Sequence, residues 1–313
     1  MGFYNQDNFV DGSTEQAPIL MRLIMLLAFI IIGTIIGLGI IAGLGYIQGI
    51  DPENIVNIIN TDNSLSNRNL VRSTLLINHL TMFVLPGLFF AYLYYKKNWA
   101  YFLHLTKMPI IRNIGLGILI MLVAIPFVQF SYWINQQLPL PEWAMTMENS
   151  TNELIENLLL VEAPYELLFN ILVIAIIPAL SEEIIFRGII QQKLTNVMGN
   201  PHVAIWVTGF IFSAIHMQFE GFLPRMILGA LLGYLFYWTK NLWIPILAHF
   251  VNNAAQIVLQ FLYANEISSL DLDNADEMPW SFGIISLIFV FVLANFMRNN
   301  NITSKESEQE EIA

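Results

Sequence analysis

Long apolar runs, separated by short polar segments, are the feature that most restricts the fold of this 313-residue chain. Most runs approach the length of about 20 residues that an α-helix needs to cross a bilayer while satisfying its own backbone hydrogen bonds. Only 12% of the residues are charged, about half the share in a soluble domain. The pattern predicts an all-α, polytopic integral membrane bundle of about eight transmembrane helices. The expected helices cover residues 19–47, 74–95, 110–133, 166–190, 202–219, 223–239, 241–263 and 280–297.

The rest of the chain is predicted to form polar ends around this bundle. We expect a polar N-terminal tail over residues 1–17, a transmembrane domain over 18–298 and a disordered acidic C-terminal tail over 299–313. The first apolar run is too long for the core of a cleavable signal peptide. The chain has no Cys, which excludes disulfides and a cysteine nucleophile. The net charge of −11 does not favour nucleic acid as a partner.

The distribution of Lys and Arg predicts the orientation of the helices. If both termini are cytoplasmic, ten of the 13 basic residues fall on the cytoplasmic side, and only Arg68, Arg72 and Arg225 fall outside. The loops expected after the third and the seventh helix are acidic, which we interpret as solvated surface on the opposite side. We therefore expect an integral membrane protein with both termini in the cytoplasm.

Two adjacent glutamates interrupt the apolar run expected over 166–190. A carboxylate at bilayer depth costs several kcal/mol, so it needs a partner or a function. Glu183 and Arg187 are four residues apart on one helix face, with the acid first, and can neutralise each other. Glu182 lies about 100° around the helix and is left available for proton transfer.

Two further motifs place polar residues in later apolar runs. Phe212 and His216 are four residues apart, as are His249 and Asn253. Counted from the inner helix ends at about 1.5 Å per residue, Glu182 and these polar residues lie roughly 12–21 Å deep. This agreement predicts one site near mid-membrane.

Hydrolysis is the chemistry that these side chains fit. A carboxylate in a site of low dielectric constant can act as a general base toward water, with a histidine to hold that water. His249 and Asn253, on one face, can donate to a developing oxyanion. Glu182, His216 and His249 could instead bind zinc, although the His-Glu-x-x-His helix of zinc peptidases is absent. No cofactor is favoured, and zinc stays open as an alternative.

The ordered motifs Glu182-Glu-Ile-Ile-Phe-Arg187, Phe212-Ser-Ala-Ile-His216 and His249-Phe-Val-Asn-Asn253 carry a family resemblance. The chain resembles the type II CAAX prenyl endopeptidases, also called the CPBP or ABI family of intramembrane proteases, over a core of about residues 165–255.

The resemblance implies a role for each motif residue. Glu182 and His216 would activate water, and His249 and Asn253 would form the oxyanion site. Glu183, Arg187 and Phe212 would support this core.

The resemblance is to bacterial members, which implies an endopeptidase of a bacterial plasma membrane acting on a membrane-associated or peptide substrate. Such members are tied to peptide maturation or to bacteriocin self-immunity. Two other functions stay open at this point. A non-catalytic scaffold or self-immunity protein would keep the fold without needing the full polar set. A proton-coupled transporter would also place Glu, His and Asn at mid-membrane.

Overall fold

A computed structural model describes residues 18–55, 58–159, 161, 164–264 and 279–310, and all of their regular secondary structure is helical. The α-helices are α1 (Ile19–Gln48), α2 (Ile58–Thr61), α3 (Leu65–His79), α4 (Leu85–Tyr95), α5 (Trp99–Phe102), α6 (Ile111–Gln136), α7 (Glu142–Leu159), α8 (Pro164–Asn170), α9 (Ile177–Ile185), α10 (Gln192–Met198), α11 (Pro201–Ala214), α12 (Phe222–Thr239), α13 (Trp243–Ala264) and α14 (Trp280–Glu310). Three π-helical segments are η3 (Leu80–Val84), η5 (Ile171–Ile176) and η6 (Phe186–Gln191), and two 3₁₀ turns are η2 (Pro52–Asn54) and η4 (Lys96–Asn98). The predicted all-α membrane fold is confirmed.

Seven helical stretches of the described chain are long and apolar enough to cross a membrane. They are Ile19–Gln48, Leu65–Phe102, Ile111–Gln136, Tyr165–Met198, Phe222–Thr239, Trp243–Tyr263 and Trp280–Asn301. The prediction of eight spans was too high by one, because α11 has only 14 residues. At about 1.5 Å per residue it rises roughly 21 Å, less than the hydrocarbon core of a bilayer.

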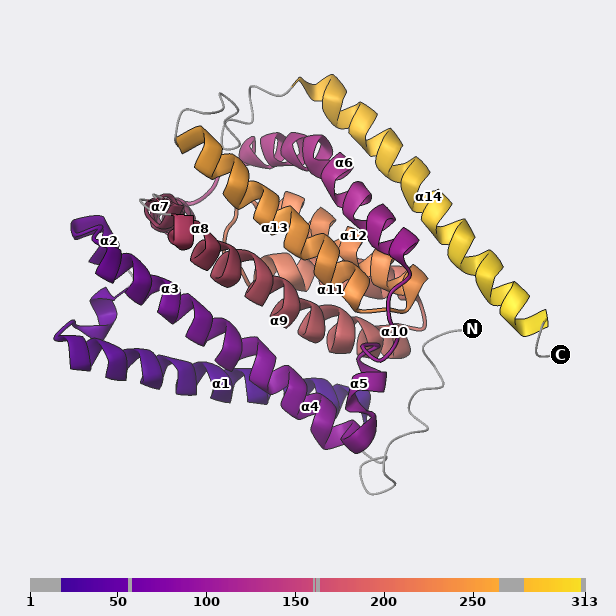
Figure 1. The fold of residues 1–313 in the computed structure, drawn as a ribbon, viewed down its shortest axis with the longest axis horizontal. Coiled ribbons are helices and arrows are strands. Elements are labelled where there is room, and N and C mark those ends of the chain that lie inside the picture. Colours follow the sequence, from indigo (N-terminus) through magenta and orange to yellow (C-terminus); the bar gives the residue numbers. More distant parts are fainter. Residues whose placement is uncertain (1–17, 56–57, 160, 162–163, 265–278, 311–313) are drawn as a thin grey trace.

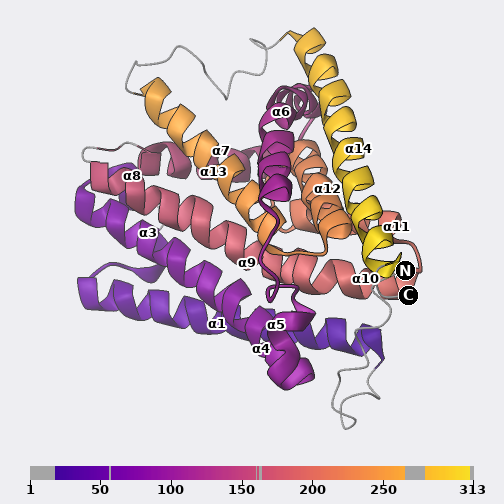
Figure 2. The ribbon, with the colours of Figure 1, turned by 45° about the vertical axis from the view of Figure 1, so that its right-hand side comes forward.

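The helix that carries the paired glutamates runs through the middle of the bundle (Figure 1). On one side of it, α1 packs against α3, η3 and α4, and η3 in turn packs against α9. On the other side, α6 packs against α12, α13 and α14, and α13 packs against α9 and η5. Figure 2 shows the same order, with α14 on the outer flank. The site helix is therefore enclosed by protein on both sides.

Two π-helical segments, η5 and η6, flank α9, and Pro178 is the second residue of α9. A proline has no backbone N–H, so Pro178 cannot donate the helical hydrogen bond to the carbonyl oxygen of Ile174. That oxygen accepts instead from the Nδ2 of Asn253, at 3.4 Å. The irregular helix thus makes a backbone group available to a side chain of α13.

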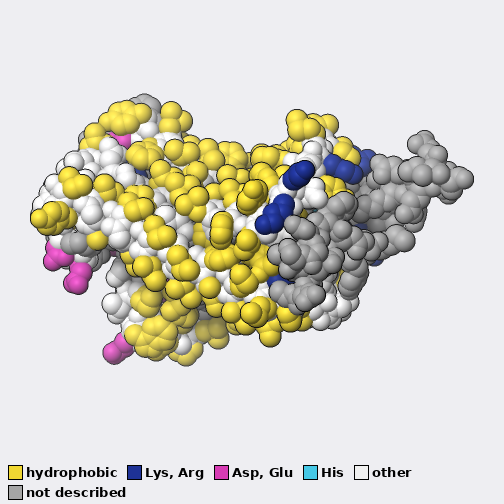
Figure 3. All heavy atoms as spheres, turned by 90° about the horizontal axis from the view of Figure 1, so that it is seen from below, with side chains coloured by type: hydrophobic (Ala, Val, Ile, Leu, Met, Phe, Trp, Pro, Cys, Tyr) yellow, Lys and Arg dark blue, Asp and Glu magenta, His cyan; other side chains and the backbone are white. Residues whose placement is uncertain are grey.

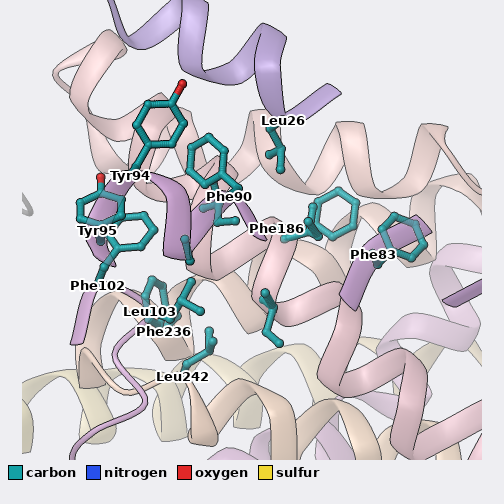
Figure 4. Packing of buried hydrophobic residues seen from close by; sticks show 14 of the residues in the cluster. Leu26, Phe83, Phe90, Tyr94, Tyr95, Phe102, Leu103, Phe186, Phe236 and Leu242 are labelled. Carbon is teal, nitrogen blue, oxygen red and sulfur yellow. The ribbon is translucent and has the colours of Figure 1, made fainter. Parts of the chain in front are cut away.

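An aromatic cluster brings α4 and α5 together with η6, which is distant from them in the sequence (Figure 4). The rings of Tyr95 and Phe102 stack with their centroids 3.7 Å apart, and the Nζ of Lys193 donates to the Tyr95 hydroxyl at 2.5 Å. Lys193 is 1% exposed, so it is a buried residue of this cluster. Lys193 is expected at the cytoplasmic end of its helix, and in the structure this end is packed within the protein.

Three sequence expectations about polar segments need correction. The helix expected over 74–95 begins at Leu65, so Arg68 and Arg72 lie within it; both are buried and paired with Glu166 at 2.9 and 3.0 Å. The acidic loop expected after the third helix contains α7, and its Glu148 is buried. Residues 299–310, predicted to be a disordered tail, continue α14. The expected tail over 1–17 and the acidic loop over 265–278 lie outside the described residues.

Hydrophobic side chains cover the middle of the molecular surface (Figure 3). In this view the visible Asp and Glu side chains lie toward one end and Lys and Arg toward the other. The apolar middle is the surface that a lipid bilayer would cover.

Candidate active site

A cavity of about 360 Å³ lies among α3, α7, α9, α12 and α13. The polar side chains that line it are His79, Thr151, Glu182, His216, Arg225, His249, Asn252, Asn253 and Gln256. All four residues predicted to be catalytic are therefore brought together at one cavity, from three segments of the chain. This placement is consistent with the prediction that these residues form one site.

Glu183 is the centre of a buried hydrogen-bond network below the cavity. Its Oε1 accepts from Nη1 of Arg187 at 2.5 Å and from Nδ1 of His249 at 2.9 Å. Nη2 of Arg187 donates to the carbonyl oxygen of Gly229 at 2.7 Å. Glu183 thus ties α9 to α13, a contact that its pairing with Arg187 alone does not provide.

Glu182 lines the cavity itself. Its Oε2 lies 3.9 Å from Nε2 of His249, which is beyond hydrogen-bond distance. The side chain is 4% exposed. Two adjacent glutamates therefore differ sharply: Glu183 accepts two charge-assisted hydrogen bonds, whereas the Glu182 carboxylate faces the cavity.

The ring nitrogens of the two histidines have distinct environments. Nδ1 of His216 lies 2.7 Å from the carbonyl oxygen of Phe212, and since a carbonyl only accepts, Nδ1 carries the proton. Nδ1 of His249 donates in the same way to Glu183. In both rings Nε2 is therefore the nitrogen that can serve the cavity.

Phe212 holds this arrangement by packing. Its ring lies 4.9 Å from that of His216 and 6.1 Å from that of His249, measured between centroids. The guanidinium carbon of Arg187 lies 5.1 Å from the centre of the Phe212 ring, a cation–π contact. The predicted supporting position of Phe212 is consistent with these contacts.

Asn253 and Asn252 form the α13 side of the cavity. Nδ2 of Asn252 donates to Oδ1 of Asn253 at 3.3 Å, and Nδ2 of Asn253 points to the Ile174 carbonyl. The expected oxyanion donor therefore already has a backbone acceptor. Its hydrogen bond is long, at 3.4 Å, so the amide can be redirected at small cost.

The sequence motifs do not include His79 and Arg225, which also line the cavity. The distribution of Lys and Arg placed Arg225 on the outer side of the membrane. Nδ1 of His79 lies 3.3 Å from Oγ of Ser181, next to Glu182. A histidine inside an apolar run was the available signal for His79. Arg225 gave none, because its position depends on the turn between α11 and α12.

The donor set was tested for a metal. Within the described chain, no three His, Asp or Glu side chains are arranged so that they could hold a metal ion. Nδ1 of His249 donates to Glu183 and its Nε2 lies 3.9 Å from Oε2 of Glu182, so these two groups would supply only two ligands. Zinc stays the alternative to a metal-free reaction.

The fold and the cavity define a helical membrane protein with a polar cavity enclosed among its helices. Residues 164–255 match the family model of the Rce1-like, type II CAAX prenyl endopeptidases. This confirms the family resemblance over the predicted core.

Three curated bacterial proteins resemble the same part of the chain. The membrane-embedded CAAX protease MroQ of Staphylococcus aureus (strain USA300) is 34% identical over 95 residues, which cover 28% of this chain and 38% of MroQ. The putative membrane peptidase YdiL of Bacillus subtilis (strain 168) is 32% identical over 90 residues, 29% of this chain and 36% of YdiL. The uncharacterized protein YpbD of the same organism is 30% identical over 89 residues, 27% of this chain and 42% of YpbD. The chain thus spans less than half the length of these relatives in each match. No solved structure matches it.

Proposed function

We propose that the chain is a glutamate-dependent intramembrane endopeptidase that hydrolyses a peptide bond of a membrane-associated or peptide substrate. The proposal rests on the different environments of the two glutamates and on the orientation of the two histidines. Glu182 is a buried carboxylate at a cavity wall, its neighbour Glu183 takes the ion pair, and His216 and His249 present Nε2 to the same cavity. Such a carboxylate is placed to act as a general base.

In the proposed reaction, Glu182 removes a proton from water, and the hydroxide attacks the carbonyl carbon of the scissile amide. Nε2 of His216 orients the attacking water. The tetrahedral intermediate collapses with cleavage of the C–N bond, and the proton held by Glu182 passes to the leaving nitrogen. Water is the only co-substrate, so the products are a carboxylate and an amine.

The oxyanion is stabilised by His249 and Asn253. Nδ1 of His249 donates to Glu183, so Nε2 is the ring nitrogen that faces the cavity, where it donates to the oxyanion when it carries a proton. Asn253 joins it by turning its amide away from Ile174.

A cleavage assay tests this proposal. Purified protein in lipid nanodiscs is incubated with a pool of hydrophobic peptides, and products are identified by mass spectrometry. We expect Glu182→Gln to lower kcat by at least about 100-fold, since general-base catalysis contributes about 10² to 10⁴. Glu153→Gln is the matched control, because that glutamate lies exposed on α7.

The same assay separates the alternatives. Full activity of a folded Glu182→Gln protein would reject the general base. Loss of wild-type cleavage on chelation, restored by zinc, would favour the zinc alternative. A wild-type protein that cleaves no peptide would favour the scaffold, self-immunity or transporter alternatives. We further propose the bacterial plasma membrane as the location, with both termini in the cytoplasm.

A further inference from the structure

Arg225 is a cation at the cavity for which the proposed reaction has no role. It lies in the first turn of α12, and Nη1 donates to the carbonyl oxygen of Gln218 at 2.8 Å. No carboxylate of the described residues makes an ion pair with it. The charges of Glu148 and Glu182 act on it without forming an ion pair, so a guanidinium at the wall of this cavity favours an anionic ligand that binds it directly.

The carboxylates nearest to Arg225 are already used. Oε2 of Glu148 accepts from the backbone nitrogens of Phe219 and Glu220, at 2.7 and 3.3 Å. Glu182, the only acid among the described residues that line the cavity, is the proposed base. Arg225 is near enough to Glu182 and His216 to interact electrostatically with both. A group bound to Arg225 would therefore lie close to the reacting atoms.

The turn before α12 leaves room for this guanidinium. A Cβ added at Gly221 would lie 2.5 Å from Nη2 of Arg225, so glycine leaves the room that the guanidinium occupies. Gly221 has φ −92°, which any residue can adopt, so a side chain here would be accommodated by a shift of the Arg225 guanidinium. An alanine here would move the guanidinium without removing its charge.

We infer that Arg225 binds an anionic group of the substrate inside the cavity and thereby selects substrates, an inference that rests on the proposed peptidase function. The group is a carboxylate, which a guanidinium can bind through two parallel hydrogen bonds. It can come from the C-terminus of the substrate or from an acidic side chain. A cavity of about 360 Å³ is at the small end of ligand pockets, so the carboxylate must lie within a few residues of the scissile bond.

Matched peptides test this inference in nanodiscs. Each hydrophobic peptide is made in three forms: a free C-terminal carboxylate without acidic residues, a C-terminal amide without acidic residues, and a C-terminal amide with one Glu. We expect wild-type protein to prefer one anionic form over the neutral form by at least about tenfold in kcat/KM. The preferred form identifies the source of the carboxylate. Equal cleavage of all three forms would overturn the inference and leave the peptidase proposal intact.

Variants assign the preference to Arg225. We expect Arg225→Gln to remove it by raising KM for the anionic form relative to that for the neutral form. Arg225→Lys should keep part of it, and Gly221→Ala should weaken it. Arg112→Gln, at an exposed arginine, is the control and should change nothing. A folded Arg225→Gln protein that keeps the full preference would overturn the inference.

A binding measurement separates this inference from the proposed function. Affinities for the three peptide forms are measured with Glu182→Gln protein, which is not expected to cleave, with and without Arg225→Gln. Tighter binding of an anionic form that depends on Arg225 supports the anion site even if the wild-type protein cleaves nothing. Equal binding of all forms counts against it.

Discussion

At the scale of single residues, adjacent Glu182 and Glu183 have different environments because α9 turns them by about 100°. Glu183 is 0% exposed and accepts from Arg187 and His249, whereas Glu182 is directed to the cavity. One carboxylate therefore holds Arg187 and His249 in place, and the other is available for chemistry.

This difference predicts opposite effects on stability and activity. We expect Glu183→Gln to lower the free energy of unfolding by about 3–5 kcal/mol, because it leaves Arg187 buried without its counter-ion. We expect Glu182→Gln to leave stability nearly unchanged while abolishing cleavage. Thermal unfolding in detergent, followed by tryptophan fluorescence, measures both variants. Equal destabilisation by the two substitutions would contradict the division of roles.

His104 lies between the membrane spans that end at Phe102 and begin at Ile111, and it makes the stability of the protein depend on pH. Burial lowers the pKa of His104 from 6.5 to about 4, and the charge of Lys240 acts in the same direction. Between pH 7 and 5 the unfolded chain gains a proton there that the folded protein does not, so unfolding becomes easier by about 2 kcal/mol. Stability from His104 is thus lost as the pH falls through this window.

The variant His104→Asn tests this effect. Asn tolerates the positive φ of 56° at this position and does not titrate. We expect the melting temperature of wild-type protein to fall more between pH 7 and 5 than that of the variant. His202→Asn, at a histidine on α11, serves as the control and should follow the wild type. An equal fall in melting temperature between pH 7 and 5 for the wild type and His104→Asn would contradict the prediction.

The residues of the site could be predicted from sequence only where spacing along one helix decides the contact. The Glu183–Arg187 pair follows from a separation of four residues on one helix face. The contact between Asn253 and Ile174 requires Pro178 and two helices, and the place of Arg225 requires the turn at Gly221. Such contacts depend on tertiary packing, which no local pattern contains.

At the scale of elements, α7 forms a wall of the cavity. Its polar composition indicated a loop, but Leu154 and Leu158 face the protein, and both line the cavity with Thr151 and Ile155. Each end is fixed by hydrogen bonds: Glu148 accepts from the backbone of Phe219 and Glu220 near one end. At the other end, the Leu158 carbonyl oxygen accepts from Arg72 and Asn170 at 3.2 and 2.7 Å. A helix with an amphipathic face thus replaces the predicted acidic loop.

Glu148 provides the test of how α7 is held. We expect Glu148→Ala to free two backbone N–H groups of the turn between α11 and α12, a loss of about 1.5–3 kcal/mol per charged hydrogen bond. Hydrogen exchange over residues 142–159 and 215–221 should accelerate by on the order of tenfold or more. Glu153→Ala, on the exposed face of the same helix, should leave exchange unchanged. Equal exchange in the two variants would show that Glu148 does not anchor α7.

At the scale of the whole molecule, the two ends differ in charge. In Figure 1, α5, α10 and the C-terminal end of α14 lie at one end, and α2, α7 and α8 lie at the other. Figure 3 shows basic side chains toward the first end and acidic side chains toward the second. Since cytoplasmic loops of membrane proteins are enriched in Lys and Arg, the end with α5 and α10 is the one expected to face the cytoplasm.

Cysteine labelling tests this orientation without any labelling of native thiols, because the chain contains no Cys. The three variants Lys97→Cys, Arg298→Cys and Glu153→Cys each place one thiol at an exposed position. Intact bacterial cells expressing each variant are treated with a membrane-impermeant maleimide, before and after permeabilisation. We expect Glu153→Cys to react in intact cells, and the other two only after permeabilisation, because Lys97 and Arg298 lie at the basic end. The reverse pattern would place the termini outside, so that α7 and its wall of the cavity would face the cytoplasm.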